Sequence, residues 1–150
     1  MIARTTARGL IIPAVMLAIL AFVLTSCPAN RDGMPGQLAS AKEEAQSAAR
    51  SAALALDLWA GERSSRQLVS VQLADARDEV AKAYDGIAVL KAEDSADLSR
   101  QSMLTRSMTD IIATLNQANA AVRALPNTGN ADRLRRTLLE ASDELERNYR

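Results

Sequence analysis

Histidine is absent from this 150-residue chain, cysteine occurs once, and aromatic residues make up only 3% of it. Without histidine the chain cannot form a Ser-His-Asp triad or a Cys-His nucleophile, and most zinc and haem sites are excluded. A single cysteine also excludes a disulfide within the chain. No phosphate-binding glycine loop and no HExxH, GxSxG or CxxC motif is present. We therefore expect no catalytic residue, no metal and no cofactor, and we do not expect an enzyme.

Neither sign of charge dominates, because 18 lysine and arginine residues balance 18 aspartate and glutamate residues. Proteins that bind nucleic acid need a basic surface, so we expect no nucleic acid as a partner. At the start of the chain, Arg4 and Arg8 precede an uncharged apolar run, and no acidic residue offsets them. This is the layout of a secretory signal peptide. The run contains Pro13 and, at about 16 residues, is shorter than the roughly 20 that a membrane-spanning helix needs.

The apolar run closes with Leu24-Thr25-Ser26-Cys27, which resembles the lipobox of bacterial lipoprotein precursors. That pattern has an aliphatic residue, two small residues and an obligatory cysteine whose sulfur receives a diacylglyceryl group. The resemblance implies cleavage before Cys27 and attachment of lipid to that residue. A lipidated Cys27 would hold the mature protein at the cell membrane or the outer membrane, on the extracytoplasmic side. The resemblance covers only residues 1–27 and identifies no family for the mature domain.

Composition divides the chain into three parts. We predict a lipoprotein signal peptide over residues 1–26, a flexible tether over residues 27–36 and a helical bundle domain over residues 37–150. The predicted tether contains two prolines and two glycines, which disfavour both helix and strand. It would keep the domain near the bilayer without fixing its orientation.

The predicted domain lacks the period-two alternation that is typical of half-buried strands. Small and aliphatic residues instead recur at alternating steps of three and four, which is the heptad pattern of packed helices. In four successive segments these residues are Leu38, Ala41, Ala45, Ala48, Ala52, Ala55 and Trp59; Val69, Leu73, Ala76, Val80, Ala83, Ile87 and Leu90; Leu104, Met108, Ile111, Leu115, Ala118, Val122 and Leu125; and Leu134, Leu138, Ala141 and Leu145. The pattern predicts an all-α fold, an antiparallel up-down bundle of three to four helices.

The breaks between these segments differ in strength. Gly61 is a natural end for the first helix, and residues 126–130 contain the proline and glycine that end the third. Between the second and third segments, Glu93 and Asp94 favour a helix start because acids stabilise the N-terminal end of the helix dipole. No glycine or proline enforces a break there, so a single helix over residues 65–125 is the alternative.

The polar side of the last segment carries opposite charges four residues apart. Each such pair stabilises a helix by about 0.2–0.5 kcal/mol. The predicted pairs are Asp132–Arg136, Arg136–Glu140, Asp143–Arg147 and Glu146–Arg150.

Four residues are candidates for contact with a partner. Trp59 is the last heptad residue of the first segment. It either fills the end of the hydrophobic core or is an exposed anchor of the kind enriched in binding hot spots. From Ser107 to Ala121 the third segment carries one charge, which predicts a helix either enclosed by its neighbours or presented to a partner. In the second case Asn116, Asn119 and Arg123 are the contacts, since they recur on one side at helical spacing.

These patterns favour a binding or scaffolding module that is anchored by lipid to the cell envelope, with an envelope protein as its partner. Anchoring confines the module to a thin layer, which makes weak contacts effective. The alternative is a carrier of a small apolar or lipidic ligand between the helices, which would need an apolar cavity of several hundred Å³. Heptads can also pair between chains, so self-association stays open.

Overall fold

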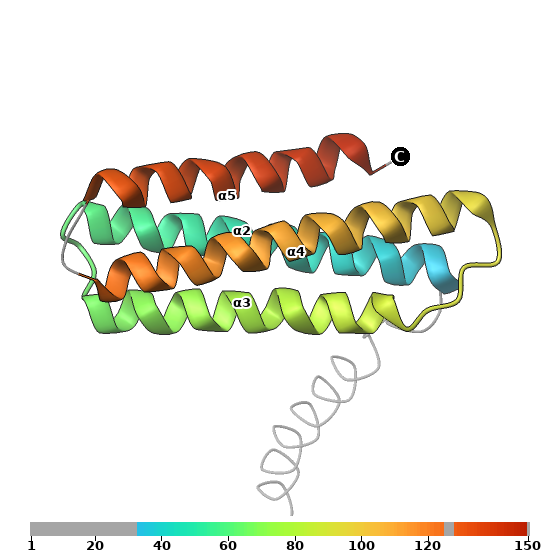
Figure 1. Cartoon of the computed structure of the whole chain (residues 1–150), viewed down its shortest axis with the longest axis horizontal. Coiled ribbons are helices and arrows are strands. Elements are labelled where there is room, and N and C mark those ends of the chain that lie inside the picture. The colour runs from blue at the N-terminus through green and yellow to red at the C-terminus, as the bar shows by residue number, and fades with distance from the viewer. Residues whose placement is uncertain (1–32, 125–127, 150) are drawn as a thin grey trace, which may run out of the picture. The chain divides into compact units, whose positions relative to one another are not determined.

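The computed structural model describes residues 33–124 and 128–149, which form an antiparallel bundle of four helices (Figure 1). The helices are α2 (Gly33–Ala60), α3 (Arg66–Ala88), α4 (Ser95–Arg123) and α5 (Thr128–Asn148). The predicted all-α up-down bundle is confirmed. The predicted signal peptide and Cys27 lie outside the described residues.

Helix α2 begins at Gly33 rather than at Gln37, so the last four residues of the predicted tether, 33–36, are helical. The prediction of a tether over these residues is wrong because Pro35 lies in the first turn of the helix. Backbone N–H groups in a first turn have no partner within the helix, and a proline there therefore costs little.

The end of α2 is a Schellman turn. Arg63 donates its backbone N–H to the carbonyl of Leu58 at 2.8 Å, and Glu62 donates to Trp59 at 3.0 Å. Glu62, and not the neighbouring Gly61, takes the left-handed conformation with φ of 55°. The turn satisfies carbonyl groups that the end of a helix leaves without partners.

Helices α3 and α4 are separate, so the alternative of one long helix over residues 65–125 is wrong. Two side chains fix the break without glycine or proline. Gln101 donates to the carbonyls of Ile87 at 2.6 Å and Leu90 at 2.9 Å, which caps the end of α3. Asp94 is the N-cap of α4, and its carboxylate accepts the backbone N–H of Ala96 at 2.6 Å.

Each helix packs against its neighbour in sequence, and α5 returns to pack against α2 (Figure 1). Within the described residues α2 also contacts α4 across the bundle, whereas α3 and α5 do not contact each other. The reason is the size of the α2 side chains: alanine lets a neighbouring backbone approach closely. Helices α2 and α4 therefore each contact all three others, whereas α3 and α5 each contact two in the described part of the chain.

The core consists of the heptad positions that the sequence predicts. Nearly all of them are buried, while Trp59, Leu90 and Ala141 are half-buried and pack against the core. Leu125 lies outside the described residues. Helix α2 also buries a second set of residues, at helical spacing, that the heptad pattern does not predict: Gln46, Ala49, Ala53 and Leu56.

Tyr149 follows α5 and places the end of the chain beside the start of α2. Its hydroxyl donates to the carbonyl of Pro35 at 3.4 Å. We call the part of the bundle that contains the start of α2, the α3–α4 connection and the end of α5 the proximal end. The even number of passes thus returns the C-terminal residues to the proximal end, as the up-down topology requires.

Candidate binding face on helix α4

Helix α4 exposes one continuous stripe although it packs against three helices. The stripe recurs at alternating steps of four and three and consists of Ser102, Arg106, Thr109, Ala113, Asn116, Ala120 and Arg123, all of them exposed. We call these residues the α4 stripe. Five of the seven side chains are uncharged, so water holds this surface less strongly than the charged faces of the bundle. The low charge of this segment therefore reflects both burial on one side and an uncharged surface on the other.

The structure brings two of the three predicted contacts on α4 together on a side chain of α3. Ser70 donates its hydroxyl to Oδ1 of Asn119 at 2.8 Å. Nε of Arg123 donates to the same hydroxyl oxygen at 3.2 Å. Asn119 is half-buried, so this bridge joins α3 to α4. These two polar groups have a partner inside the domain already.

Asn116 and Trp59 lie in different surroundings. Asn116 is exposed within the α4 stripe, and its side chain makes no hydrogen bond within residues 33–124 and 128–149. Trp59 lies in the last turn of α2, half-buried, with its ring against the hydrophobic core. Of the four predicted contacts, Asn116 is thus the one whose side chain is open to a partner.

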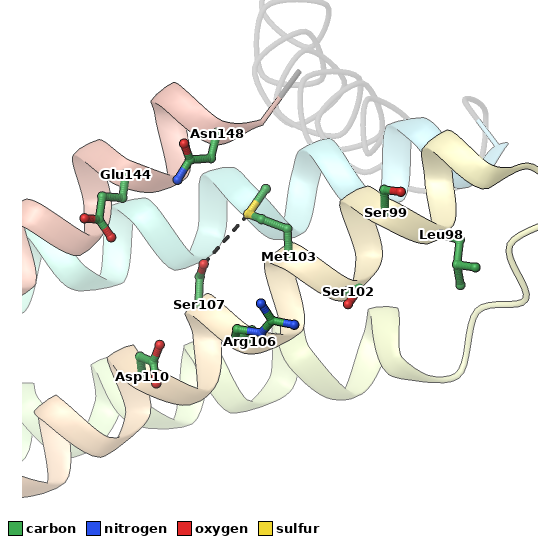
Figure 2. A pocket seen from close by; sticks show the side chains of 9 residues that line it. All are labelled: Leu98, Ser99, Ser102, Met103, Arg106, Ser107, Asp110, Glu144 and Asn148. Atoms are coloured by element: carbon green, nitrogen blue, oxygen red, sulfur yellow. Dashed lines mark hydrogen bonds between the residues drawn. The ribbon is translucent and has the colours of Figure 1, made fainter.

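A groove of about 630 Å³ runs between the N-terminal half of α4 and the C-terminal half of α5 (Figure 2). Its lining residues are Leu98, Ser99, Ser102, Met103, Arg106, Ser107, Asp110, Glu144 and Asn148. Seven of these nine are polar or charged, so the groove is not the apolar cavity that a lipid carrier needs. The sequence offers one hint of it, Arg106 and Asp110 one turn apart on α4. Nothing local in the sequence pairs that turn with Glu144 on α5.

The charged side chains of this groove do not neutralise one another. Arg106, Asp110 and Glu144 all line it, and Figure 2 shows them extending from two helices around the same hollow. Among the described residues no ion pair or side-chain hydrogen bond is recorded for any of the three. As far as residues 33–124 and 128–149 show, the groove therefore presents one cation and two anions that are not paired with each other.

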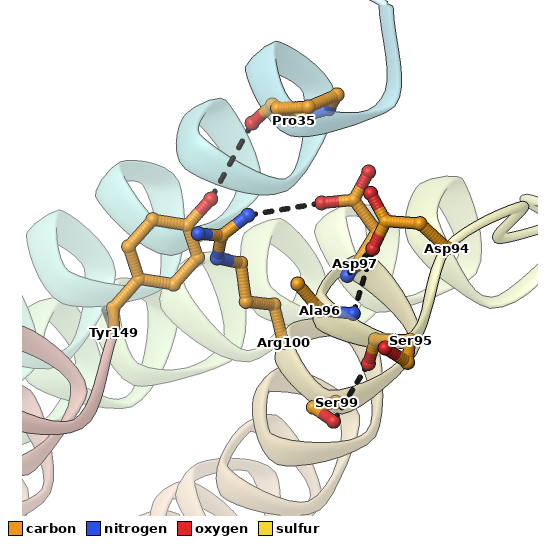
Figure 3. A network of polar contacts seen from close by, with 8 residues as sticks. All are labelled: Pro35, Asp94, Ser95, Ala96, Asp97, Ser99, Arg100 and Tyr149. Carbon is orange, nitrogen blue, oxygen red and sulfur yellow. Dashed lines mark hydrogen bonds and ion pairs between the residues drawn. The ribbon is translucent and has the colours of Figure 1, made fainter.

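A polar cluster closes the proximal end of the bundle (Figure 3). Asp97 is only 7% exposed and accepts from Arg100 at 3.1 Å. Both groups act on the Tyr149 phenol, whose pKa is raised above 10.0, mainly by burial and further by the charge of Asp97, while Arg100 opposes the rise. The cluster joins the end of the chain to the first turns of α2 and α4.

Hydrogen bonds and ion pairs join α2 to α5, although the buried Ser142 hydroxyl has no hydrogen-bond partner among the described residues. Gln46, buried on α2, donates to the backbone carbonyl of Ser142 and to Oε2 of Glu146, both at 3.0 Å. Lys42 pairs with the same carboxylate oxygen at 3.2 Å and lies 5.2 Å from the centre of the Tyr149 ring. These donors, Gln46 first and Lys42 next, lower the pKa of Glu146 below its ordinary 4.5.

The described part of the chain holds neither a metal-binding cluster nor a membrane-spanning helix. Within it, no group of three or more Cys, Asp or Glu side chains is placed to hold a metal ion. No helix among residues 33–124 and 128–149 has the length and apolar character needed to cross a bilayer.

Comparison of the chain with protein-family models, with curated proteins and with solved structures finds no match.

Proposed function

We propose that this chain is a lipoprotein of the bacterial cell envelope whose helical bundle acts as a binding or scaffolding module. A lipid on Cys27 would anchor it to the cell membrane or the outer membrane, on the extracytoplasmic side. Its partner would be another envelope protein, which docks on the α4 stripe around Asn116.

The position of Cys27 carries the proposal. The cysteine follows an apolar run and two small residues, and five residues, Pro28–Asp32, separate it from the first residue of α2. Even when fully extended, such a link spans at most about 20 Å. Two or three acyl chains on one cysteine bind a bilayer far more firmly than a single chain does, since each buried methylene contributes about 0.8 kcal/mol. The proximal end of the bundle would then stay close to the lipid surface.

The α4 stripe supports a binding role more than a carrier role. Its uncharged side chains are cheaper to desolvate than ion-paired ones, and its heptad spacing is suited to a partner helix. Confinement near a membrane raises the effective concentration of the module, so that a modest contact of this kind is sufficient. The groove beside it is polar, which gives the carrier of an apolar ligand no support.

Anchoring is tested by replacing the cysteine. We expect the full-length protein to partition into the detergent phase and to incorporate a palmitate analogue, whereas Cys27→Ala should do neither and should accumulate as uncleaved precursor. Ser26→Ala is the matched control, because alanine keeps a small residue beside the cleavage site. Unchanged processing and detergent partitioning of Cys27→Ala would overturn the proposed anchoring.

Binding is tested by site-specific crosslinking in intact cells. A photoreactive residue at Asn116, within the α4 stripe, should give a discrete crosslinked product with an envelope protein. The same residue at the exposed Asp75 on α3 is the control and should give none. Equal products from both positions would show that the contact is not specific to α4.

A further inference from the structure

We propose that the groove between α4 and α5 binds a short peptide through its free ammonium and carboxylate ends. The inference goes beyond the proposed docking of an envelope protein and adds a second ligand, in a groove that shares only Ser102 and Arg106 with the α4 stripe. It does not depend on lipid attachment, and it concerns a different part of α4 from Asn116.

The size of the groove suits a small ligand. At about 630 Å³ it falls inside the range of roughly 300–1,000 Å³ that is typical of small-molecule sites. Arg106 and Asp110 lie one helical turn apart, which is about 6 Å along the axis at 1.5 Å per residue. An extended chain covers about 3.3–3.6 Å per residue, so a dipeptide or tripeptide can reach both.

The charges select the ends of such a ligand. The Arg106 guanidinium is planar and presents paired N–H donors, which match the two oxygens of a carboxylate. Asp110 on α4 and Glu144 on α5 are the two carboxylates of the groove, and either one can accept from an ammonium group (Figure 2). Because no partner for these three groups is recorded in the described parts of the chain, a ligand does not have to break an internal ion pair first.

The remaining lining fits the middle of a peptide. Ser102, Ser107 and Asn148 offer both donors and acceptors for peptide N–H and carbonyl groups. Met103 and Leu98 add apolar surface for a small side chain.

The same lining disfavours other ligand classes. No aromatic residue lines the groove, so a sugar ring has nothing on which to stack. A phosphate group would meet one arginine and two carboxylates, which gives a net repulsion. A lipid chain would have to displace water from hydroxyl, amide and charged groups without replacing their hydrogen bonds.

The test is an NMR titration of the full-length protein in detergent micelles with tri-alanine, N-acetyl-tri-alanine and tri-alanine amide. Tri-alanine should shift the backbone resonances of residues 98–110 and 144–148 in a saturable way. Blocking either end should weaken binding roughly tenfold, the loss expected for one charge-assisted contact. Arg106→Gln should give the same loss for tri-alanine and should abolish discrimination against the amide. Arg136→Gln and Glu140→Gln are the matched controls on the outer face of α5 and should bind normally.

Absence of saturable shifts in the groove would overturn the inference, as would equal affinity for the free and blocked peptides. Larger shifts from N-acetylglucosamine than from tri-alanine would overturn it in favour of a sugar. Detergent partitioning of the same preparation is scored separately. Failure of the titration therefore leaves the proposed anchoring intact, and failure of anchoring leaves the titration unaffected.

Discussion

Helix α5 packs against α2 and α4, and its contacts with these two helices differ. Toward α2, Gln46 and Lys42 converge on Glu146, and a further pair joins Arg50 to Asp143 at 3.8 Å. Toward α4 there is a groove instead, and Glu144 lies beside it without a recorded partner in the described residues. One side of the helix is thus closed by paired groups and the other is open.

The size of the facing side chains explains the difference. On α2, Ala49 and Ala53 lie at helical spacing between Gln46 and Asp57, two residues whose side chains reach α5. Alanine allows the two backbones to approach, so a side chain as short as glutamine reaches the α5 main chain. On α4 the groove is lined by longer side chains, Met103 and Arg106. We infer that the α2–α5 contact stabilises the fold and that the α4–α5 side is left free for binding.

The largest expected effect comes from filling the close contact. Ala53 is 2% exposed, so Ala53→Leu adds three carbon atoms where no space is available. We expect a loss of about 1–3 kcal/mol in the free energy of unfolding, measured by urea denaturation with circular dichroism.

Ala113→Leu on the α4 stripe is the matched control, since the same atoms are added at an exposed site. There we expect a change within about 0.5 kcal/mol. Similar losses at both positions would show that the two sides of the bundle do not differ in packing.

The next effect concerns the buried amide. Gln46→Ala removes the donor to the Ser142 carbonyl and to Glu146 at a position only 6% exposed. We expect a loss of about 1–2 kcal/mol, because one of the two bonds is to a charged group. Denaturation of this variant should be compared with Gln101→Ala, which removes the cap of α3 instead. If Gln46→Ala is as stable as the parent, the α2–α5 network contributes nothing to the fold.

The fold is predictable from this sequence because a heptad is a local signal. The buried face of each helix can be predicted from the spacing of small and aliphatic residues along that helix alone. Positions such as Leu73 and Ile111 are buried as expected. The second set of buried residues on α2 is not local in this sense. Its residues are buried because three helices surround α2, and the spacing within one segment does not reveal how many neighbours a helix has.

Polar contacts are harder to predict for the same reason. The sequence predicts that Asp143 and Glu146 pair within the last helix, but the structure directs them to Arg50 and Lys42 on α2. The predicted pair Glu146–Arg150 involves a residue outside the described range. A long side chain at an interface can reach a neighbouring helix as easily as its own, and only the packing decides which one it meets.

The candidate contacts on α4 likewise show which features the sequence predicts and which depend on the packing of helices. Their helical spacing correctly places Asn116, Asn119 and Arg123 on neighbouring turns of one helix. It gives no information on Ser70, which lies on another helix and already binds two of them. The groove cannot be predicted from the sequence, because Glu144 lines the same groove as Arg106 and Asp110 only when α4 packs against α5.

A smaller effect is expected in the titration of Glu146. Its pKa is lowered, so the ionised carboxylate stabilises the fold above pH 4.5, and this contribution is lost as the pH falls through the lowered pKa. Carboxyl NMR should give a pKa below 4.5 in the parent protein. The pKa should return toward 4.5 in Gln46→Ala, which removes the largest single cause, and in Lys42→Met, which removes the next two. A parent value at or above 4.5 would contradict the observed contacts.

The smallest expected effect is at the groove, where removing charge should leave the fold unchanged. Arg106→Gln, Asp110→Asn and Glu144→Gln each remove a group for which no partner is recorded in the described residues, and we expect changes within about 0.5 kcal/mol. The comparison is informative because Gln46→Ala, a single truncation on the other side of the bundle, should cost more than any of them. A measurable loss in Glu144→Gln would mean that this carboxylate does support the fold. The open side of α5 would then be structural, and its free charges could no longer be assigned to ligand binding.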